Sequence, residues 1–414
     1  MTQFNIILFG ATSFVGQILT RYFVEHVVPT SPELRWAIAA RSAEKLADLK
    51  REIGEAAADI PVLIVDANNV EQLNAMCQAT DVVVSTVGPY AFYGEPLVKA
   101  CVENGTDYCD LTGETQWIRR MIDAYESQAQ ASGARIVHCC GFDSVPSDMG
   151  VKVLQQHAMA KFGTPVSSIE MGVKTLKGGA SGGTIASLIN VLEEAKANPA
   201  LRKQLANPYL LCPSNHSFKA RQHAVKGSEF SELHQSWWAP FVMAAINERI
   251  VHRSNACLDN AYGVDFTYTE GMLMGKGGKG KRRSLKTAFG LGVFMVAVSI
   301  APLRKLLQKF VLPKPGEGPT PKEQLAGRFD MRFVGRHCNG QTVSVKVTGD
   351  RDPGYGSTAK MLGQAALCLA FDHRNEQSKT GRLGGFWTPA SMFDERYIER
   401  LRNEAGVVVE VMAD

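Results

Sequence analysis

Short apolar runs alternate with amphipathic stretches along the first 140 residues. Apolar runs occupy residues 5–9, 36–40, 62–65, 81–87 and 136–140, with a further short one around Tyr108. Between the first two runs, apolar side chains such as Val15, Leu19 and Phe23 recur at helical spacing. Strands that are apolar throughout and alternate with helices predict a parallel sheet covered on both faces. The expected fold class is therefore α/β, with a doubly wound sheet.

A glycine-spaced turn follows the first of these runs directly. The sequence Gly10-Ala-Thr-Ser-Phe-Val-Gly16 leads from the apolar run into a helical pattern. Such a turn directs backbone N–H groups and the positive end of a helix dipole at one point, as a Rossmann-type fold does to hold a pyrophosphate. Ser13 stands where a middle glycine is usual, so the fingerprint is a variant one. The turn residues predicted to bind a dinucleotide are Gly10, Thr12, Ser13, Phe14, Val15 and Gly16.

Residues that follow the other strands are the remaining candidates, because such sheets bind ligands beyond the carboxyl ends of their strands. Arg41 stands where an acidic residue would hold the ribose 2′-hydroxyl of NAD. A guanidinium there suits the 2′-phosphate of NADP instead. The alternative for Arg41 is a solvated arginine at the start of a helix. The further cofactor-binding candidates are Ser42, Asp66, Thr86, Val87, Gly88, Pro89, Tyr90, Gly141 and Phe142.

Beyond Gly150 the pattern changes. Residues 330–333 and 342–347 alternate between apolar and polar, which predicts antiparallel strands with one wet face. We therefore expect an α+β domain with a mainly antiparallel sheet after the Rossmann-type domain. The predicted divisions are a dinucleotide-binding domain over 1–148, a substrate or oligomerisation domain over 149–350, and a C-terminal segment over 351–414. The aromatic run at 237–241 either walls an apolar pocket or belongs to ordinary packing.

Within the second domain, the segment 276–310 joins a basic stretch to an apolar one. Six lysines and arginines lie between residues 276 and 286, and residues 287–301 carry no charge. Those uncharged residues would span about 22 Å as a helix, whereas a bilayer crossing needs about 20 residues. No transmembrane helix is therefore predicted. The alternatives are a segment on an anionic membrane surface, a dock for an acidic carrier protein, a core helix beside a solvated loop, or an oligomer contact.

Composition narrows the class of protein. With 414 residues, 45% hydrophobic and 21% charged, the chain is expected to be globular and long enough for two domains. A net charge of +4 is too small to indicate nucleic-acid binding.

The nine cysteines include no Cys-x-x-Cys pair, so we predict no disulfide framework, no metal site and a reducing, cytoplasmic setting. Adjacent Cys139 and Cys140 are interpreted as buried small side chains. The N-terminus lacks the basic region of a signal peptide.

Six motifs together resemble those of saccharopine dehydrogenase-like oxidoreductases, and more narrowly those of mycobacterial-type trans-acting enoyl reductases. They are Gly10-Ala-Thr-Ser-Phe-Val-Gly16, Ala40-Arg-Ser42, Thr86-Val-Gly-Pro-Tyr90, Asp110-Leu-Thr-Gly-Glu114, Gly141-Phe-Asp-Ser-Val-Pro-Ser-Asp148 and Thr388-Pro-Ala390. The resemblance covers nearly the whole chain. It implies NADP(H) as the cofactor and a C-terminal segment, 351–414, that packs back on the dinucleotide-binding domain.

The same resemblance implies an activity. Trans-acting enoyl reductases reduce a carbon–carbon double bond of a carrier-bound acyl chain, so the expected substrate is an acyl or other small molecule. An acyl carrier protein or the inner face of a membrane is the candidate partner, and a homodimer is the candidate assembly. The alternatives are an imine or amino-acid reductase of the saccharopine type, and a membrane-associated NADP-binding protein without turnover.

Four residues near the predicted crevice are candidate proton donors or relays. They are Tyr90, Tyr93, Asp143 and Ser144. A developing enolate needs a donor close to its oxygen, and each of these side chains carries a proton-bearing group. For the two tyrosines the alternative is a packing wall against the cofactor, and for Asp143 it is a helix cap.

Overall fold

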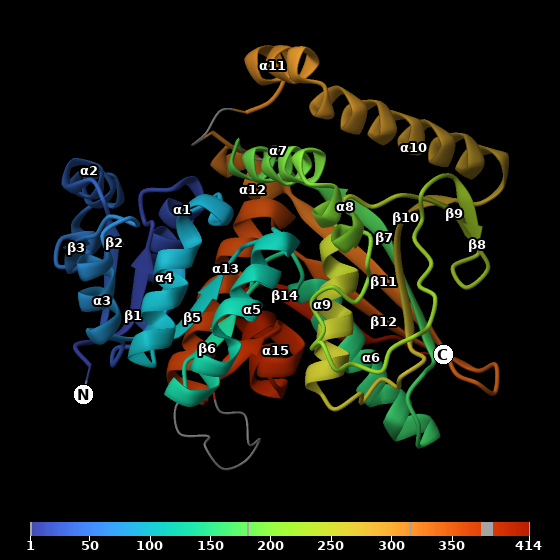
Figure 1. The fold of residues 1–414 in the computed structure, drawn as a ribbon, viewed down its shortest axis with the longest axis horizontal. Helices are drawn as coiled ribbons and strands as arrows, with labels where there is room; N and C mark the ends of the chain where they lie inside the picture. Colours follow the sequence, from blue (N-terminus) through green and yellow to red (C-terminus); the bar gives the residue numbers. More distant parts are fainter. Residues whose placement is uncertain (1, 180–181, 314–316, 374–383, 414) are drawn as a thin grey trace. The chain divides into compact units, whose positions relative to one another are not determined.

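The computed structural model describes residues 2–179, 182–313, 317–373 and 384–413. The chain forms two compact units (Figure 1). The first contains Met1–Phe142, Gly316–Gly318 and Gly354–Gly406. The second contains Asp143–Pro315, Pro319–Pro353 and Val407–Asp414. Each unit holds one seven-stranded sheet.

The sheet of the first unit is parallel in all its pairings. Its strands are β1 (Phe4–Phe9), β2 (Trp36–Ala40), β3 (Val62–Ile64), β4 (Thr80–Ser85), β5 (Asp107–Asp110), β6 (Arg135–Val137) and β13 (Gly385–Trp387). They follow the order β13-β6-β5-β4-β1-β2-β3. This is the doubly wound dinucleotide-binding order with one added strand, and it reverses between β1 and β4. The α/β fold predicted from the apolar runs is confirmed.

Helices surround this sheet. Helices α3 (Val70–Gln78), α4 (Tyr90–Asn104) and α5 (Thr115–Ser132) pack side by side, and α1 (Phe14–Tyr22) packs against α13 (Thr358–Leu367). The other helices of this unit are α2 (Ala43–Ile53), α14 (Pro389–Met392) and α15 (Glu395–Asn403). Right-handed crossovers place α1 and α2 on one face and α3 to α5 on the other, so the apolar strands are buried between two helical layers.

The sheet of the second unit is mixed and mainly antiparallel, as predicted. Its strands are β7 (Ser168–Lys177), β8 (Glu229–Ser231), β9 (Ser236–Ala239), β10 (Thr267–Gly275), β11 (Arg328–Arg336), β12 (Thr342–Gly349) and β14 (Val407–Val411). Their order is β14-β12-β11-β7-β10-β9-β8, and β7 and β10 form its parallel pair. Burial alternates along β11 and β12, which accounts for the period of two in the sequence.

The helices of the second unit cover this sheet unevenly. They are α6 (Val145–Phe162), α7 (Gly182–Ala197), α8 (Pro199–Leu205), α9 (Ala244–Cys257), α10 (Gly277–Ser299), α11 (Ala301–Phe310) and α12 (Pro321–Ala326). Helices α6 and α9 pack on each other, α6 on β11, β12 and β14, and α9 on β10. The approach of α6 is close, because a Cβ at Gly150 would lie 2.5 Å from the ring of Phe333.

The aromatic run 237–241 forms most of β9 and packs within its own unit. Trp238 is 3% exposed, and a Cβ at Gly271 on β10 would lie 2.6 Å from its ring. Trp237 contacts Phe230 with ring centroids 5.7 Å apart, and the Lys281 ammonium lies 5.1 Å from its ring centroid. These contacts favour ordinary packing over the wall of a substrate pocket.

The segment after residue 350 divides between the two sheets, whereas the sequence analysis treated 351–414 as one piece. Residues 354–406 belong to the first unit, where β13 pairs in parallel with β6. Strand β14 instead pairs with β12 in the second unit. Helix α14 ends after four residues, and α15 begins at Glu395, where Asp394 accepts a hydrogen bond from the Arg396 amide.

Helices α10 and α11 arise from the basic and apolar segment 276–310. Neither they nor any other single helix of the described ranges is long and apolar enough to cross a bilayer. The two helices meet at an angle of 106°. Figure 1 shows α11 above α7, beyond the end of α10 that lies away from β9.

Candidate dinucleotide site

The turn after β1 requires glycine at both of its ends. Gly10 has a φ of +90°, and a Cβ there would lie 2.7 Å from Cγ2 of Val87. A Cβ at Gly16 would overlap the carbonyl oxygen of Gly10 and lie 2.9 Å from Cα of Ala11. The first glycine therefore permits a left-handed turn, and the second permits α1 to start against the strand.

Ser13, the departure from the usual glycine pattern, is the N-cap of α1. Its hydroxyl oxygen accepts a hydrogen bond from the Gly16 amide at 3.0 Å. The Ser13 hydroxyl donates to Oγ1 of Thr86 at 3.0 Å, and the Thr86 hydroxyl donates to the Gly10 carbonyl at 3.0 Å. This chain of bonds ties the end of β1 to the end of β4, where the strand order reverses.

The start of α1 fits a pyrophosphate. Among the described residues, the amides of Phe14 and Val15 have no acceptor, and the first turn of α1 carries no acidic side chain. Thr12 is half-buried beside them. Unpaired helix-start amides and the positive helix end together attract an anion.

Arg41 is exposed directly after β2 and forms no ion pair with any residue of the described ranges. Ser42 caps α2, since its hydroxyl oxygen accepts from the Lys45 amide at 3.2 Å. Asp66, after β3, accepts from the Asn68 amide at 2.8 Å and so closes a turn. Of these three strand-end residues, Arg41 has the free charge that a 2′-phosphate would pair with.

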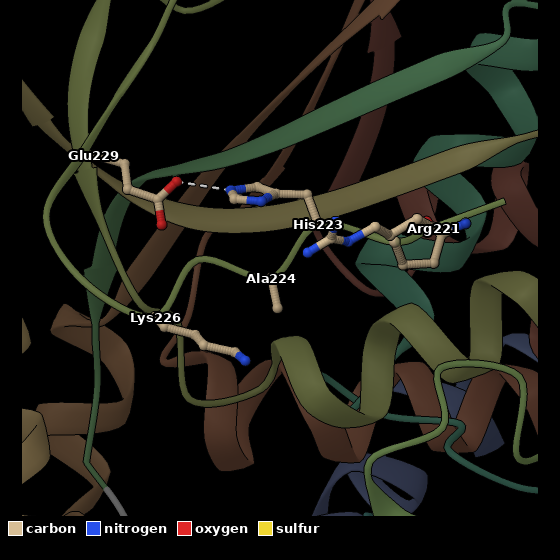
Figure 2. A pocket seen from close by; sticks show the side chains of 6 residues that line it. Arg221, His223, Ala224, Lys226 and Glu229 are labelled. Atoms are coloured by element: carbon tan, nitrogen blue, oxygen red, sulfur yellow. Dashed lines mark hydrogen bonds and ion pairs between the residues drawn. The ribbon is translucent and has the colours of Figure 1, made fainter.

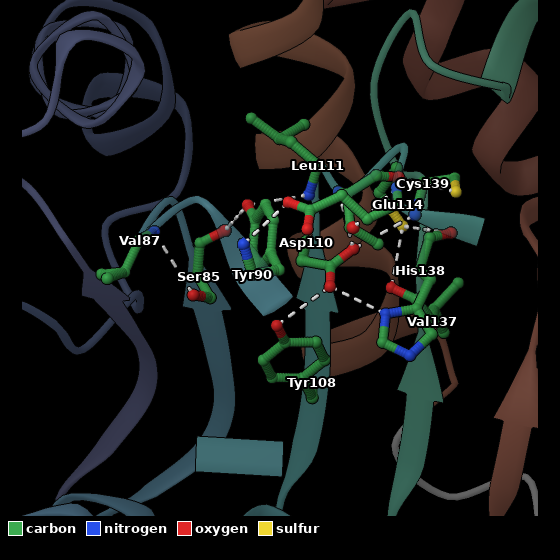
Figure 3. Close-up of polar contacts among 12 residues, drawn as sticks. Ser85, Val87, Tyr90, Tyr108, Asp110, Leu111, Glu114, Val137, His138 and Cys139 are labelled. Atoms are coloured by element: carbon green, nitrogen blue, oxygen red, sulfur yellow. Dashed lines mark hydrogen bonds and ion pairs between the residues drawn. The ribbon is translucent and has the colours of Figure 1, made fainter. Parts of the chain in front are cut away.

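Tyr90 is the first residue of α4, and its hydroxyl forms hydrogen bonds with backbone groups (Figure 3). It is 6% exposed. Its hydroxyl donates to the Ser85 carbonyl at 3.0 Å and accepts from the Leu111 amide at 3.2 Å. Tyr93, one turn into the same helix, is 38% exposed. The two predicted tyrosines therefore differ, because the Tyr90 hydroxyl is engaged in the fold and Tyr93 reaches solvent.

Glu114 holds the start of α4 and has no assigned role in the sequence analysis. Its two carboxylate oxygens accept from the amides of Tyr90 at 2.8 Å and Ala91 at 3.0 Å. The side chain is 1% exposed. A buried carboxylate on a helix N-terminus gains both hydrogen bonds and the helix dipole. Thr86, Val87, Gly88 and Pro89 lie between β4 and this anchored helix start.

A second buried carboxylate, Asp110, joins the ends of β5 and β6 (Figure 3). Its Oδ2 accepts from the Tyr108 hydroxyl at 2.9 Å and lies 2.7 Å from Nδ1 of His138. Its Oδ1 accepts from the amides of Thr112 at 3.1 Å and Cys139 at 3.2 Å. Burial and the nearby Asp110 carboxylate raise the pKa of Tyr108 well above its usual value.

The loop after β6 is fixed by packing. Cys139 and Cys140 are fully buried, as interpreted from the sequence, and burial raises the pKa of Cys140 well above its usual value. Gly141 follows, and the Phe142 amide donates to Oγ1 of Thr358 on α13 at 2.9 Å. The two predicted cofactor residues of this loop are therefore held by a helix more than 200 positions later in the chain.

Asp143 and Ser144 belong to the second unit. The N-cap of α6 is Ser144 rather than Asp143, and no side-chain bond caps the helix. The buried Ser144 hydroxyl donates to Oδ1 of Asn247 at 3.1 Å. This places Ser144 in a polar cluster with α9 and β10 that the sequence analysis missed.

That cluster contains two carboxyl groups on neighbouring elements. Glu270 accepts from the Asn247 side-chain amide at 2.9 Å and from the Tyr268 hydroxyl at 2.7 Å. Glu248 accepts from the Glu270 backbone amide at 3.4 Å. Burial, and then the Glu270 carboxylate, raise the pKa of Glu248 to about 8. Burial raises the pKa of Glu270 to about 7. Burial thus brings the pKa values of both acids into the neutral range.

The second unit also has a charged cavity of about 490 Å³ (Figure 2). It is lined by Arg221, Gln222, His223, Ala224, Lys226 and Glu229. Nε2 of His223 lies 2.7 Å from Oε2 of Glu229. This polar lining suits an anionic or polar group rather than a long acyl chain.

Comparisons with known proteins agree with this geometry. The family model of the saccharopine dehydrogenase NADP binding domain matches residues 6–137. A Mycobacterium tuberculosis protein named as a presumed trans-acting enoyl reductase is 39% identical over 408 residues, which are 96% of this chain and 95% of that protein. The trans-acting enoyl reductase of Mycobacterium ulcerans is 34% identical over 421 residues, covering 98% of this chain and 97% of that protein.

A solved structure shares the fold across both units. Apo saccharopine dehydrogenase (L-Glu forming) from Saccharomyces cerevisiae has a TM-score of 0.52 and 12% identity, covering 99% of this chain and all of that one. The matched NADP-binding domain contains the Gly10 turn, the Ser13 cap and Arg41, so NADP(H) is the cofactor. The chain belongs to the saccharopine dehydrogenase-like oxidoreductases, among the relatives named trans-acting enoyl reductases.

Proposed function

We propose that this oxidoreductase reduces the carbon–carbon double bond of an α,β-unsaturated acyl thioester. The observation that carries the proposal is identity of 34–39% over nearly the full length of proteins named for this activity. Bound NADPH supplies a hydride, which the β-carbon receives. The α-carbon then takes a proton, so the double bond becomes a single bond and atoms and charge balance.

The chain's own contribution to the cofactor is positioning. The amides of Phe14 and Val15 bind the pyrophosphate, and Arg41 pairs with the 2′-phosphate. The segment from Thr86 to Pro89 lies beside this site, between the Ser13–Thr86 bond and the Glu114-anchored helix start. Its backbone would border the nicotinamide ribose of the bound cofactor.

The two tyrosines of α4 take different roles in this proposal. The Tyr90 hydroxyl is buried and donates to a backbone carbonyl, so Tyr90 is a positioning residue that walls the cofactor. Tyr93 is exposed on the next turn, so its hydroxyl is the candidate proton donor to the enolate. Ser144 already donates to Asn247 and serves in the polar cluster of the second unit.

The test follows NADPH oxidation at 340 nm with a panel of trans-2-enoyl thioesters of increasing chain length. We expect activity with enoyl thioesters. Tyr93→Phe should lower kcat about 10²-fold or more, which is the usual contribution of a positioned acid, with little effect on NADPH affinity. Tyr90→Phe serves as the matched comparison, since it removes a hydroxyl from the same helix and should act through stability and KM.

The competing activities give opposite results in the same assay. Oxidation of NADPH with a 2-oxo acid and an amine, but with no enoyl thioester, would replace the proposal with an imine reductase. Binding of NADPH without oxidation by either panel would replace it with a cofactor-binding protein that has no turnover.

A further inference from the structure

Helix α10 exposes a continuous apolar stripe. Its side chains and their exposed fractions are Leu285 51%, Phe289 74%, Val293 52% and Val296 57%, and Ile300, 44% exposed, follows directly after the helix. The four helical positions recur every three or four residues, which confines them to an arc of about 80° at about 100° per residue. Scattered exposed apolar residues are ordinary, but an aligned set over about three turns marks an interaction surface.

The opposite side of α10 is fixed to the second unit. Near its start, the Ser284 hydroxyl donates to the Trp238 carbonyl on β9 at 2.6 Å. Near its end, Val298 is fully buried and packs with Phe294 in a cluster with Ile185 and Ile189 of α7. The helix is therefore anchored near both ends, and the exposed stripe lies on the opposite side.

Helix α11 repeats the arrangement after the 106° bend. Leu307 and Leu312 pack into the same cluster on α7. Its outer residues Leu303, Leu306 and Phe310 are 45%, 55% and 68% exposed. Helices α10 and α11, which differ in direction, thus each have one side packed on the second unit and one exposed apolar side.

The charged side chains of the α10–α11 region are all basic. Residues 276–313 contain nine lysines and arginines and no aspartate or glutamate. The whole chain has a net charge of only +4, so positive charge is concentrated here and the remainder is net acidic. Lys279, Lys281 and Lys286 are all exposed in the first turns of α10.

We propose that the outer face of α10 and α11 docks on an anionic membrane surface. Helix α10 lies in the headgroup plane, its apolar stripe enters the acyl boundary, and its basic residues pair with lipid phosphates. The helical part of the stripe, from Leu285 to Val296, spans about 17 Å along the helix, and the exposed side chains of α11 extend the apolar face beyond it. A second copy of the chain would bring two basic faces together, and an acidic carrier protein would satisfy the charges while leaving the stripe uncovered.

This inference is independent of the proposed enoyl reduction, and vesicle flotation tests it directly. The full-length protein is mixed with phosphatidylcholine vesicles or with vesicles containing 30% phosphatidylglycerol. We expect flotation with the anionic vesicles, loss of that flotation at high salt as headgroup charges are screened, and little binding to the neutral ones.

Two double variants test the apolar stripe and the basic residues in turn. Phe289→Asp with Val293→Asp should abolish flotation. Lys279→Ala with Lys286→Ala should weaken it about five-fold per residue. Val264→Asp and Lys203→Ala are the matched controls, because both remove exposed side chains of the same kind elsewhere in the second unit. Each variant must keep the wild-type melting temperature and NADPH affinity.

Several outcomes would overturn the proposal. One is wild-type protein that stays at the bottom of the gradient with anionic vesicles. Another is flotation that the double aspartate variant leaves unchanged. Light scattering could instead show a wild-type dimer that binds no vesicles. If the double aspartate variant were then monomeric, the face would be assigned to a second copy of the chain. Retention by an acidic acyl carrier protein alone would assign it to that partner.

Discussion

Replacing Glu248 by glutamine should stabilise the second unit at alkaline pH. Glu248 is 8% exposed, and burial together with the Glu270 carboxylate raises its pKa from 4.5 to about 8. The folded protein therefore keeps a proton on this carboxyl that the unfolded chain has lost. Stability from this group is fully present below pH 4.5 and is lost as the pH rises through 8.

The magnitude follows from the pKa shift. Each pH unit between the unfolded and folded pKa values costs about 1.4 kcal/mol. Between pH 5 and pH 8 the wild-type free energy of unfolding should therefore fall by about 3 kcal/mol relative to Glu248→Gln. Glutamine is neutral at every pH and similar in shape, so the variant should be close to wild type at pH 5 and more stable at pH 8.

Urea unfolding at a series of pH values measures the difference. Tryptophan fluorescence follows unfolding of both units, because three of the five tryptophans lie in the first unit. Hydrogen exchange of peptides from α9 and β10 therefore locates the effect in the second unit. Glu232→Gln, an exposed glutamate of the same unit, is the control and should leave the pH dependence unchanged. The reasoning is refuted if the difference between Glu248→Gln and wild type is constant with pH, or if wild type gains on the variant as the pH rises.

Three further substitutions probe the dinucleotide unit. In calorimetry, Arg41→Ala should weaken NADPH binding about tenfold or more and leave NADH binding nearly unchanged. The control Arg51→Ala, which removes an exposed arginine from α2, should change the affinity for neither cofactor. Equal losses of affinity for NADPH and NADH in Arg41→Ala would contradict the 2′-phosphate role. Gly16→Ala should prevent measurable NADPH binding and lower the melting temperature, because its Cβ overlaps a carbonyl of the same turn; wild-type affinity would show that the turn opens freely. Asp110→Asn should cost about 3 kcal/mol or more in urea unfolding, since it breaks a buried pair with a histidine; a loss below 1 kcal/mol would mean that the network is replaceable.

Local periodicity was sufficient to predict the dinucleotide-binding sheet. Strands β1 and β2 are almost entirely apolar and fully buried, and the glycine turn has a fixed spacing that is visible without any partner. Arg41 was a candidate for the same reason, since its position directly after β2 is visible in the sequence, and its role stays a prediction. The alternation of apolar and polar residues in β11 and β12 likewise predicted a sheet with one solvent-facing side.

The role of Ser13 could not be read in the same way. Its hydroxyl bonds Thr86, which lies 73 positions away in the sequence, so the reason for a serine in place of glycine appears only when β1 and β4 are neighbours. The Asp110–His138 pair and the Glu114 cap also depend on contacts between different strands and helices. A single sequence shows these residue types without showing what they face.

Strand length also limited which strands could be predicted from the sequence. β8 and β13 have three residues each. β3 and β6 are equally short, but they overlap the longer apolar runs 62–65 and 136–140, whereas no such run surrounds β8 or β13. The acidic pair Glu248 and Glu270 lies in stretches without a recognisable motif, and only the pairing of α9 with β10 brings the two carboxyls together. Burial, which raises their pKa values, is a property of the packed unit.

The placement of β13 and β14 has a consequence for synthesis on the ribosome. Gly385 pairs with Arg135, and Val409 pairs with Val347, so each sheet receives a strand from the same late stretch of chain. Neither sheet gains its edge strand until residues 384–411 have been translated, although most of the dinucleotide-binding unit emerges first. An excised fragment of residues 1–148 would lack both α13 and β13, and the apolar surfaces they cover would favour aggregation.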